Sequence, residues 1–217
     1  MDLHLLTLFQ SFPEKSYSII RGGEANLINY EKNSDIDIFC QSIAELSKDI
    51  CSHFNQLDLP ENYTLRVREL SPGQTHIDIL KETKLKIKLD LYETLPSYKK
   101  SEINPSLFNS VIDNSTSNHQ GIYTPNKIDD LLIRYLEYVE YYELRPDKIK
   151  HLHYIEKHLN EDTHLHSEFF KRLHYYTDLP KCQIYTPPHS LSKGLPAEAL
   201  STPKLLKIIW KRALGKS

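Results

Sequence analysis

Apolar and polar residues alternate over residues 85–92, LKIKLDLY, and this is the clearest pattern in the chain. Successive side chains of a strand point to opposite faces, so the alternation predicts a strand with one buried face and one polar face. Asp90 falls on the polar face. The same alternation in residues 34–40, SDIDIFC, predicts a second strand of this kind, with Asp35 and Asp37 together on its polar face.

The rest of the first half predicts a meander of strands with helices against it. The apolar spacing over residues 2–12 is helical, and a second helical stripe begins after Ser42, where a capping-box sequence stands, and should end before Pro60. Strands are expected over two further stretches, 62–70 and 75–80. Turns are expected between the strands, over 71–74 and 81–84.

The composition of the chain changes after Tyr92. Residues 94–104 contain Pro96 and several polar residues, which indicates a connecting segment, and we place a domain boundary between Pro96 and Pro105. Beyond it, an N-cap residue followed by proline marks several helix starts. Helices are expected from Thr124, from Pro146, over 167–176 and over 204–214.

Charge and cysteine content narrow the classes of function. The net charge of −2 gives no basic excess, which argues against a duplex-binding polymerase. The chain has three cysteines without Cys-x-x-Cys spacing and no signal-peptide pattern at Met1, so we expect reduced thiols in a cytoplasmic protein. No apolar run approaches the roughly 18 residues that a membrane span needs, so no transmembrane segment is expected.

The chemistry is expected around the acidic strand 34–40. Two carboxylates on one face of a strand repel each other unless a cation, a proton or a basic side chain compensates them, and a divalent metal is the natural compensator. Gly22 and Gly23 follow a short β-branched stretch, 18–20. Adjacent glycines let backbone N–H groups approach a phosphate without a Cβ in the way.

These motifs resemble the signature of the nucleotidyltransferase superfamily that has the DNA polymerase beta-like catalytic fold. Its first part, a hydrophobic residue, glycine and a small residue, is matched around Arg21, Gly22 and Gly23. Its second part, Asp-hydrophobic-Asp-hydrophobic, is matched by the segment that carries Asp35 and Asp37. Many members have serine in the place of Gly23, so phosphate contacts here are expected from the backbone.

The superfamily also carries a third acidic residue on a later strand. Asp90 is our preferred candidate, because its strand is longer and alternates more cleanly. Asp78, between Ile77 and Ile79, is the alternative.

The resemblance implies an α+β fold, with a nucleotidyltransferase-like mixed sheet covered by helices and a helical C-terminal domain after it. The catalytic domain would span 1–98 and the mainly helical domain 104–217. The implied activity is metal-dependent transfer of a nucleoside monophosphate from a nucleoside triphosphate, such as ATP, to an acceptor hydroxyl, with release of pyrophosphate. Asp35, Asp37 and Asp90 would be both catalytic and metal-binding, with Mg²⁺ or Mn²⁺ as cofactor.

Arg21, Gly22, Gly23 and a basic residue of the second half, Lys148, are the expected nucleotide-binding residues. The acceptor is expected to be a small molecule, a sugar or a protein rather than nucleic acid. The basic helix over 204–214 suggests peripheral contact with a membrane surface or an acidic partner. Two other functions stay open: a non-catalytic binding module of the same fold, as in a toxin–antitoxin pair, and a phosphotransferase.

Overall fold

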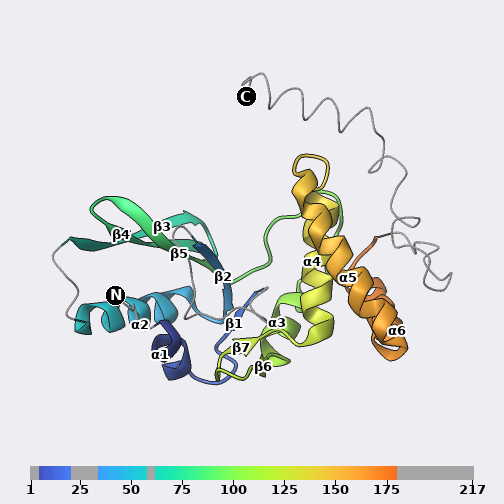
Figure 1. The fold of residues 1–217 in the computed structure, drawn as a ribbon, viewed down its shortest axis with the longest axis horizontal. Helices are drawn as coiled ribbons and strands as arrows, with labels where there is room; N and C mark the ends of the chain where they lie inside the picture. The colour runs from blue at the N-terminus through green and yellow to red at the C-terminus, as the bar shows by residue number, and fades with distance from the viewer. Residues whose placement is uncertain (1–4, 21–33, 58–61, 180–217) are drawn as a thin grey trace, which may run out of the picture. The chain divides into compact units, whose positions relative to one another are not determined.

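The computed structural model describes residues 5–20, 34–57 and 62–179. The chain forms two compact units (Figure 1). The first unit consists of residues 1–96 and 105–127, and the second of residues 97–104 and 128–217. The limits predicted from the sequence, 1–98 and 104–217, stay a prediction.

The first unit is built on a five-stranded sheet with the strand order β1-β2-β5-β4-β3. The strands are β1 (Tyr17–Ile19), β2 (Ser34–Cys40), β3 (Tyr63–Ser71), β4 (Gln74–Lys81) and β5 (Lys84–Tyr92). β2 runs parallel to β5, and all other neighbouring strands are antiparallel, so the sheet is mixed. The predicted meander is confirmed, because β3, β4 and β5 are consecutive antiparallel neighbours.

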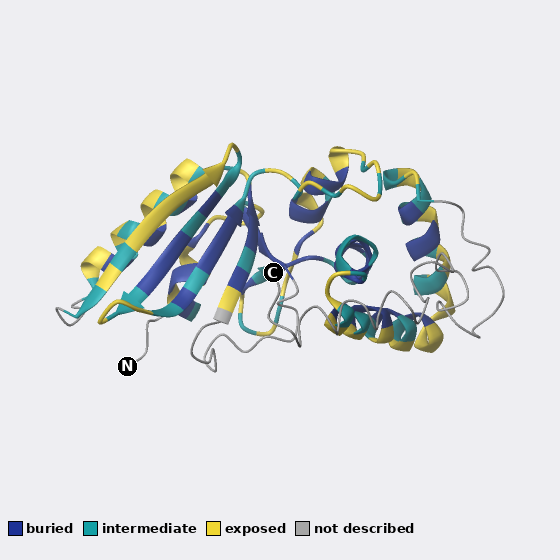
Figure 2. Ribbon diagram, turned by 90° about the horizontal axis from the view of Figure 1, so that it is seen from above, coloured by how far each residue is buried: buried dark blue, intermediate teal, exposed yellow. Residues whose placement is uncertain are grey.

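Alternation gives this sheet an apolar face and a polar face, as the sequence predicts. On the apolar face β2, β4 and β5 place a buried row of aliphatic side chains: Ile36, Ile38, Ile77, Ile79, Ile87, Leu89 and Leu91. The outermost strand, β3, is largely exposed, and Figure 2 shows this as a yellow edge beside the buried strands. Asp35, Asp37 and Asp90 stand on the opposite, polar face.

Two helices supply the partner layer for the apolar face. Helix α2 (Ile43–Gln56) buries Leu46, Ile50 and Phe54 in the same core as the sheet. The Ser42 hydroxyl accepts a hydrogen bond from the backbone N–H of Glu45 at 3.2 Å and so caps the helix, as its sequence predicts. Helix α1 (Leu5–Ser11) contributes Leu5, Leu8 and Phe9 to this core.

Tyr17 joins three segments of the first unit. Its hydroxyl donates a hydrogen bond to the Phe9 carbonyl at 2.7 Å and accepts one from the Tyr123 backbone N–H at 3.3 Å. Tyr123 begins β7 (Tyr123–Thr124), which pairs with β6 (Thr116–Ser117) after helix α3 (Ser106–Asp113). Burial is the main cause that raises the pKa of Tyr17 to about 12.

The second unit is helical, which confirms the helical character expected for this half of the chain. Its elements are α4 (Lys127–Tyr141), the short 3₁₀ helix η2 (Pro146–Lys148), α5 (Ile149–Glu161) and α6 (Thr163–Tyr176). Helix α6 begins at Thr163 rather than at the predicted residue 167, because the Asp162 carboxylate caps it by accepting hydrogen bonds from the N–H groups of His164 and Leu165. The helix expected over 204–214 lies outside the described residues.

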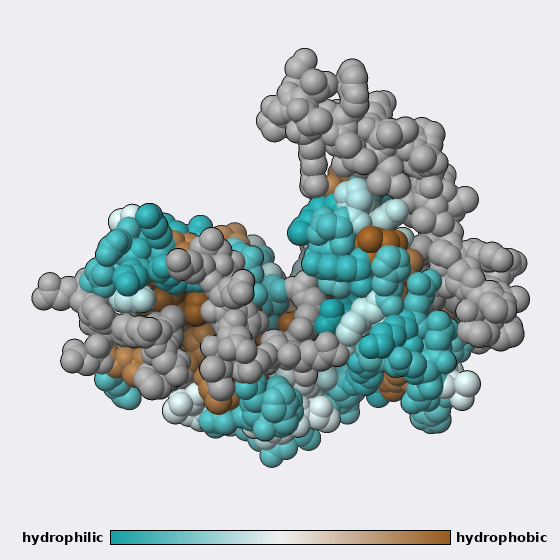
Figure 3. All heavy atoms as spheres, viewed as in Figure 1, coloured by the Kyte–Doolittle hydropathy of each residue, from teal (hydrophilic) through white to brown (hydrophobic). Residues whose placement is uncertain are grey.

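The α+β fold class is confirmed by the mixed sheet and the helices around it. In Figure 3 the side of the helical unit that faces the viewer is mostly hydrophilic, as expected where helices turn their polar sides to solvent. Among the described residues, no helix is long and apolar enough to cross a membrane.

Candidate active site

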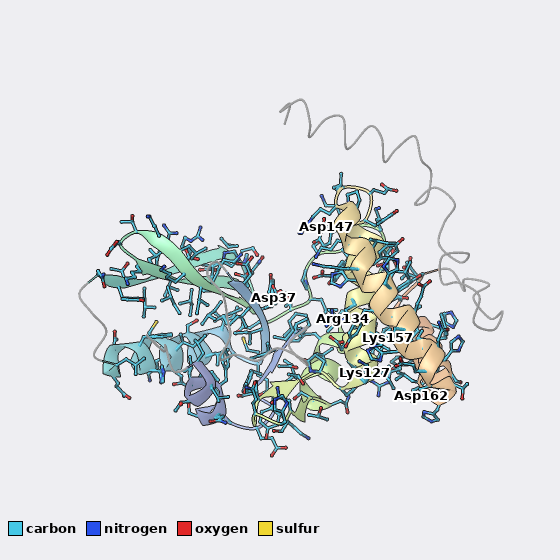
Figure 4. All side chains as sticks on the ribbon, viewed as in Figure 1. Asp37, Lys127, Arg134, Asp147, Lys157 and Asp162 are labelled. Atoms are coloured by element: carbon cyan, nitrogen blue, oxygen red, sulfur yellow. The ribbon has the colours of Figure 1, made fainter. Side chains whose placement is uncertain are left out.

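The two predicted acidic strands are direct neighbours. β2 and β5 pair in parallel, and their register sets Asp37 opposite Asp90. Register partners on neighbouring strands point to the same face and lie about 4.8 Å apart along the hydrogen-bonding direction. The structure therefore brings Asp37 and Asp90 together on the polar face, and Figure 4 marks Asp37 on β2.

The polar face carries two rows of side chains that run across the strands. One row alternates in charge along its whole length: Asp35, Lys88, Asp78 and Arg66. The other row begins with two acids and ends with two basic residue types: Asp37, Asp90, His76 and Arg68. Within these rows Asp37 and Asp90 are the one pair of like-charged neighbours. Like charges at this distance need compensation, which makes this pair the focus of the site.

Asp90 is the most enclosed acid of the predicted set, with 5 % of its surface exposed. Lys88 Nζ lies 3.0 Å from its Oδ2, and His76 Nε2 lies 3.2 Å from its Oδ1. Oδ1 nevertheless accepts no hydrogen bond from the described residues, because the His76 contact is an ion-pair distance without hydrogen-bond geometry. Burial raises the pKa of Asp90 above its ordinary value, although Lys88 and His76 act in the opposite direction.

Lys88 bridges two of the predicted acids. Its ammonium lies 3.2 Å from Asp35 Oδ2 and 3.0 Å from Asp90 Oδ2. Burial acts to lower the pKa of Lys88, but the hydrogen bonds to Asp90 and Asp35 outweigh it and the pKa is raised, so the side chain stays protonated. Asp35 is the outermost of the three acids, since its side chain is 54 % exposed.

Asp78, the alternative third acid, occupies a different position. It lies on β4, which β5 separates from β2, and its register partner on β5 is Lys88. Asp78 is 1 % exposed and binds Arg66 and Arg68. The structure thus places Asp90, not Asp78, beside Asp37. The catalytic and metal-binding roles of Asp35, Asp37 and Asp90 stay predictions.

The nucleotide-binding roles of Arg21, Gly22, Gly23 and Lys148 stay predictions. Arg21, Gly22 and Gly23 lie outside the described residues. Lys148 belongs to the helical unit, where it is 7 % exposed and its Nζ lies 2.7 Å from Glu137 Oε2. No group of three His, Cys, Asp or Glu side chains within 5–20, 34–57 and 62–179 is arranged to hold a metal ion. Mg²⁺ therefore stays a prediction.

The sequence interpretation overlooked four basic side chains of this face: His76, Lys88, Arg66 and Arg68. The sequence nevertheless contains a pattern that places each of these basic residues on the same face of its strand as another charged residue. Lys88 stands two positions before Asp90 in the alternating strand, and two such positions share a face. Arg66 and Arg68 share a face in the same way. Their positions beside the acids depend on strand order and register, which the alternation alone does not give.

Comparison with known proteins finds two distant structural likenesses. No family model matches the chain, and no curated protein matches it. JHP933 from Helicobacter pylori is 10 % identical with a TM-score of 0.35, and the alignment covers 98 % of this chain and 92 % of that one. A "putative nucleotidyltransferase from H. pylori" is 12 % identical with a TM-score of 0.29, over 98 % of this chain and 96 % of that one. Structural similarity at this level does not show to which family the chain belongs.

Proposed function

We propose that this protein is a metal-dependent nucleotidyltransferase. It transfers a nucleoside monophosphate from a nucleoside triphosphate to a hydroxyl of a small-molecule, sugar or protein acceptor and releases pyrophosphate. The observation that carries the proposal is the register of Asp37 opposite Asp90 on parallel strands. It fits the acidic constellation that the resemblance implies, on the polar face of a mixed sheet.

The neighbouring carboxylates offer oxygen ligands of the kind that a divalent cation prefers. Asp37 and Asp90 present two neighbouring carboxylates, and Asp90 Oδ1 is a buried oxygen with no hydrogen-bond donor among the described residues. Carboxylate oxygens are the ligands that Mg²⁺ prefers, and a cation is the usual compensation for such an oxygen. Asp37 would hold the cation of the triphosphate together with Asp35 on the same strand, and Asp90, opposite Asp37 on β5, would complete a second cation site that serves the acceptor hydroxyl. When bound, the cation would supply charge neutralisation on the triphosphate and on the leaving pyrophosphate.

The side chains around Asp90 suit it to accept a proton from the acceptor hydroxyl. Burial raises its pKa, and a carboxylate with a raised pKa is a stronger base. Lys88 holds Oδ2 of the same carboxylate in place and joins it to Asp35. We assign Asp90 the role of general base, and Lys88 the role of a residue that positions it.

One observation favours a second candidate, a non-catalytic binding module of the same fold. Lys88 already compensates part of the charge of Asp35 and Asp90 through contacts of 3.2 and 3.0 Å. A lysine that bridges two carboxylates can take the place of a cation and keep the face stable without one. In this second function the polar face would bind a partner rather than perform a reaction.

Nucleotide-dependent stabilisation in a thermal-shift assay tests the proposal. A mixture of ATP, GTP, CTP and UTP with Mg²⁺ should raise the Tm of the wild-type protein, and Asp37→Asn should abolish that rise while leaving the fold intact. Asp49→Asn, an exposed acid on α2 of the same unit, is the matched control and should keep the full rise. An equal Tm rise in Asp37→Asn and in the wild type would exclude Asp37 from the site.

Transfer of label separates an enzyme from a binding module. The protein is incubated with α-labelled triphosphates, Mg²⁺ or Mn²⁺ and a fractionated cell extract. A nucleotidyltransferase moves the α-label onto an acceptor and releases pyrophosphate, whereas a phosphotransferase moves only a γ-label. Absence of transfer with all four nucleotides, together with a wild-type Tm that no nucleotide changes, would favour the binding module.

A further inference from the structure

Two arginines on the edge strand β3 share one buried carboxylate. Arg66 contacts Asp78 Oδ2 through Nη2 at 2.7 Å and through Nε at 3.0 Å, and Arg68 Nη2 contacts the same oxygen at 2.9 Å. Asp78 is 1 % exposed, whereas the side chains of Arg66 and Arg68 are 54 % and 44 % exposed. The buried acid thus anchors two guanidinium groups whose outer parts face solvent.

The charge of this cluster is not balanced. Two guanidinium groups and one carboxylate sum to a single positive charge, and one arginine would suffice to neutralise Asp78. Each guanidinium has five N–H donors; Arg66 donates hydrogen bonds to Asp78 through two of its nitrogen atoms, whereas Arg68 lies at ion-pair distance from the same oxygen. The remaining donors belong to a pair of guanidinium groups that Asp78 holds and that are about half exposed. Such a pair matches the geometry and charge of a phosphate group.

The cluster lies in line with the acidic pair. Arg68 pairs with His76 on β4, which pairs with Asp90 on β5, which pairs with Asp37 on β2. β3 is therefore two strands away from Asp90, which corresponds to about 10 Å between the backbones. A ligand that spans this row would place one end at the acids and the other at the arginines.

The triphosphate itself is expected at the other side of the acids. In the row across the strands, Asp37, which is proposed to hold the cation of the triphosphate, lies on the far side of Asp90 from Arg68. A phosphate at Arg66 and Arg68 would then belong to the other substrate.

We propose that Arg66 and Arg68, held by Asp78, form a subsite for a phosphate group of the acceptor. This inference rests on the proposed function. It makes the acceptor a phosphorylated small molecule, of the sugar phosphate class. The arginines bind and orient this substrate and take no part in the bond-making step.

The test uses a variant that removes the subsite without leaving a buried charge. Loss of both arginines alone would strand the Asp78 carboxylate, which is strongly destabilising. We therefore combine Arg66→Gln and Arg68→Gln with Asp78→Asn, and add the single variant Arg68→Gln, in which Arg66 still pairs with Asp78. The control is Arg145→Gln with Asp147→Asn, an ion pair of 3.1 Å in the helical unit whose side chains are 52 % and 49 % exposed.

Calorimetry measures the affinity of the full chain for inorganic phosphate and for glycerol phosphate, with Mg²⁺ and a non-hydrolysable nucleoside triphosphate at saturation. The wild type should bind both probes while the nucleotide is bound. The triple variant should lose at least about tenfold in affinity, and Arg68→Gln should lose part of it, because each charge-assisted hydrogen bond removed weakens binding. The control should match the wild type, and the Tm rise with Mg²⁺ and triphosphate should be unchanged in every variant.

Other results overturn the inference in distinguishable ways. Unchanged phosphate affinity in the triple variant, with nucleotide binding intact, means that the arginines only neutralise Asp78. Competition between nucleotide and phosphate, or a lost nucleotide Tm rise in the triple variant, assigns the arginines to the triphosphate. If the wild-type protein binds no Mg²⁺–triphosphate at all, the proposed nucleotidyltransferase function is wrong, and the results for the arginine variants do not change that conclusion.

Discussion

Asp37 on β2 and Asp90 on β5 are register partners in parallel strands, so their carboxylates stand side by side on one face of the sheet. Apart from this pair, every acid in the two rows across the polar face has only basic residue types as its register neighbours. Two neighbouring acids without an intervening basic residue are costly in a folded protein, and such pairs are commonly found where a cation or a proton is bound.

Asp90→Asn should abolish turnover while largely sparing nucleotide binding. Asp90 is assigned to the acceptor hydroxyl, so its loss should reduce label transfer by about 10²–10⁴-fold, the usual contribution of a general base. The nucleotide-dependent rise in Tm should change little. Asp78→Asn, on the neighbouring strand β4, should have the smaller effect on kcat. Equal loss of kcat in the two variants would remove the distinction between these acids.

Lys88→Gln should make the acidic face more responsive to divalent cations. The substitution removes a positive charge that lies 3.2 Å from Asp35 and 3.0 Å from Asp90. Mg²⁺ can then compensate the carboxylate charge that the Lys88 ammonium compensates in the wild type. We expect a larger Mg²⁺-dependent rise in Tm in this variant than in the wild type, without nucleotide. Lys86→Gln, two positions earlier on the same face of β5, is the control. A Tm that Mg²⁺ does not change in Lys88→Gln would argue that no cation binds here.

Arg172→Gln should destabilise the helical unit. Arg172 Nη1 lies 2.7 Å from Oδ1 of Asp129, a side chain with 0 % exposure, so removing the arginine deprives a buried carboxylate of its cation. We expect a loss of about 3 kcal/mol in the free energy of unfolding, measured with urea. Adding Asp129→Asn should recover part of that loss, because the buried charge disappears. If Arg172→Gln is as stable as the wild type, the Asp129 charge must have other sufficient partners.

The elements of the sheet could be predicted because their signals are local. Alternation over 85–92 predicts which residues of β5 face the core, and it assigns Asp90 to the polar face without reference to a partner strand. The capping sequence at Ser42 marked the start of α2 in the same way. Each of these patterns involves residues only a few positions apart, so it can be recognised in the sequence without knowledge of the tertiary structure.

The arrangement of the site could not be predicted to the same extent. That β2 pairs in parallel with β5, and in a register that sets Asp37 opposite Asp90, depends on pairing between segments far apart in the sequence. The clusters of Asp78 with the arginines and of Lys88 with two acids follow from that pairing. Lys148 was a candidate because of its charge alone, and its burial beside Glu137 comes from helix packing that the sequence pattern does not specify.

Tyr17→Phe should remove part of the alkaline destabilisation of the protein. In the folded state burial raises the pKa of Tyr17 to about 12, whereas the unfolded chain should titrate near 10. Between these pH values the unfolded state has lost a proton that the folded state still holds. Stability therefore falls as pH rises, by up to about 1.4 kcal/mol per pH unit for one such group. Phenylalanine carries no proton to lose, so the slope should be shallower in the variant.

Urea unfolding at several pH values between 8 and 12 measures this slope for the wild type, for Tyr17→Phe and for Tyr175→Phe, an exposed tyrosine that serves as control. At pH 8 Tyr17→Phe should cost about 1 kcal/mol, because the hydrogen bond to the Phe9 carbonyl is lost. Some slope should remain, since burial also raises the pKa of Cys40 to about 12 and the pKa of Tyr138. Identical slopes in the wild type and Tyr17→Phe would mean that Tyr17 ionises as easily in the folded protein as in the unfolded chain.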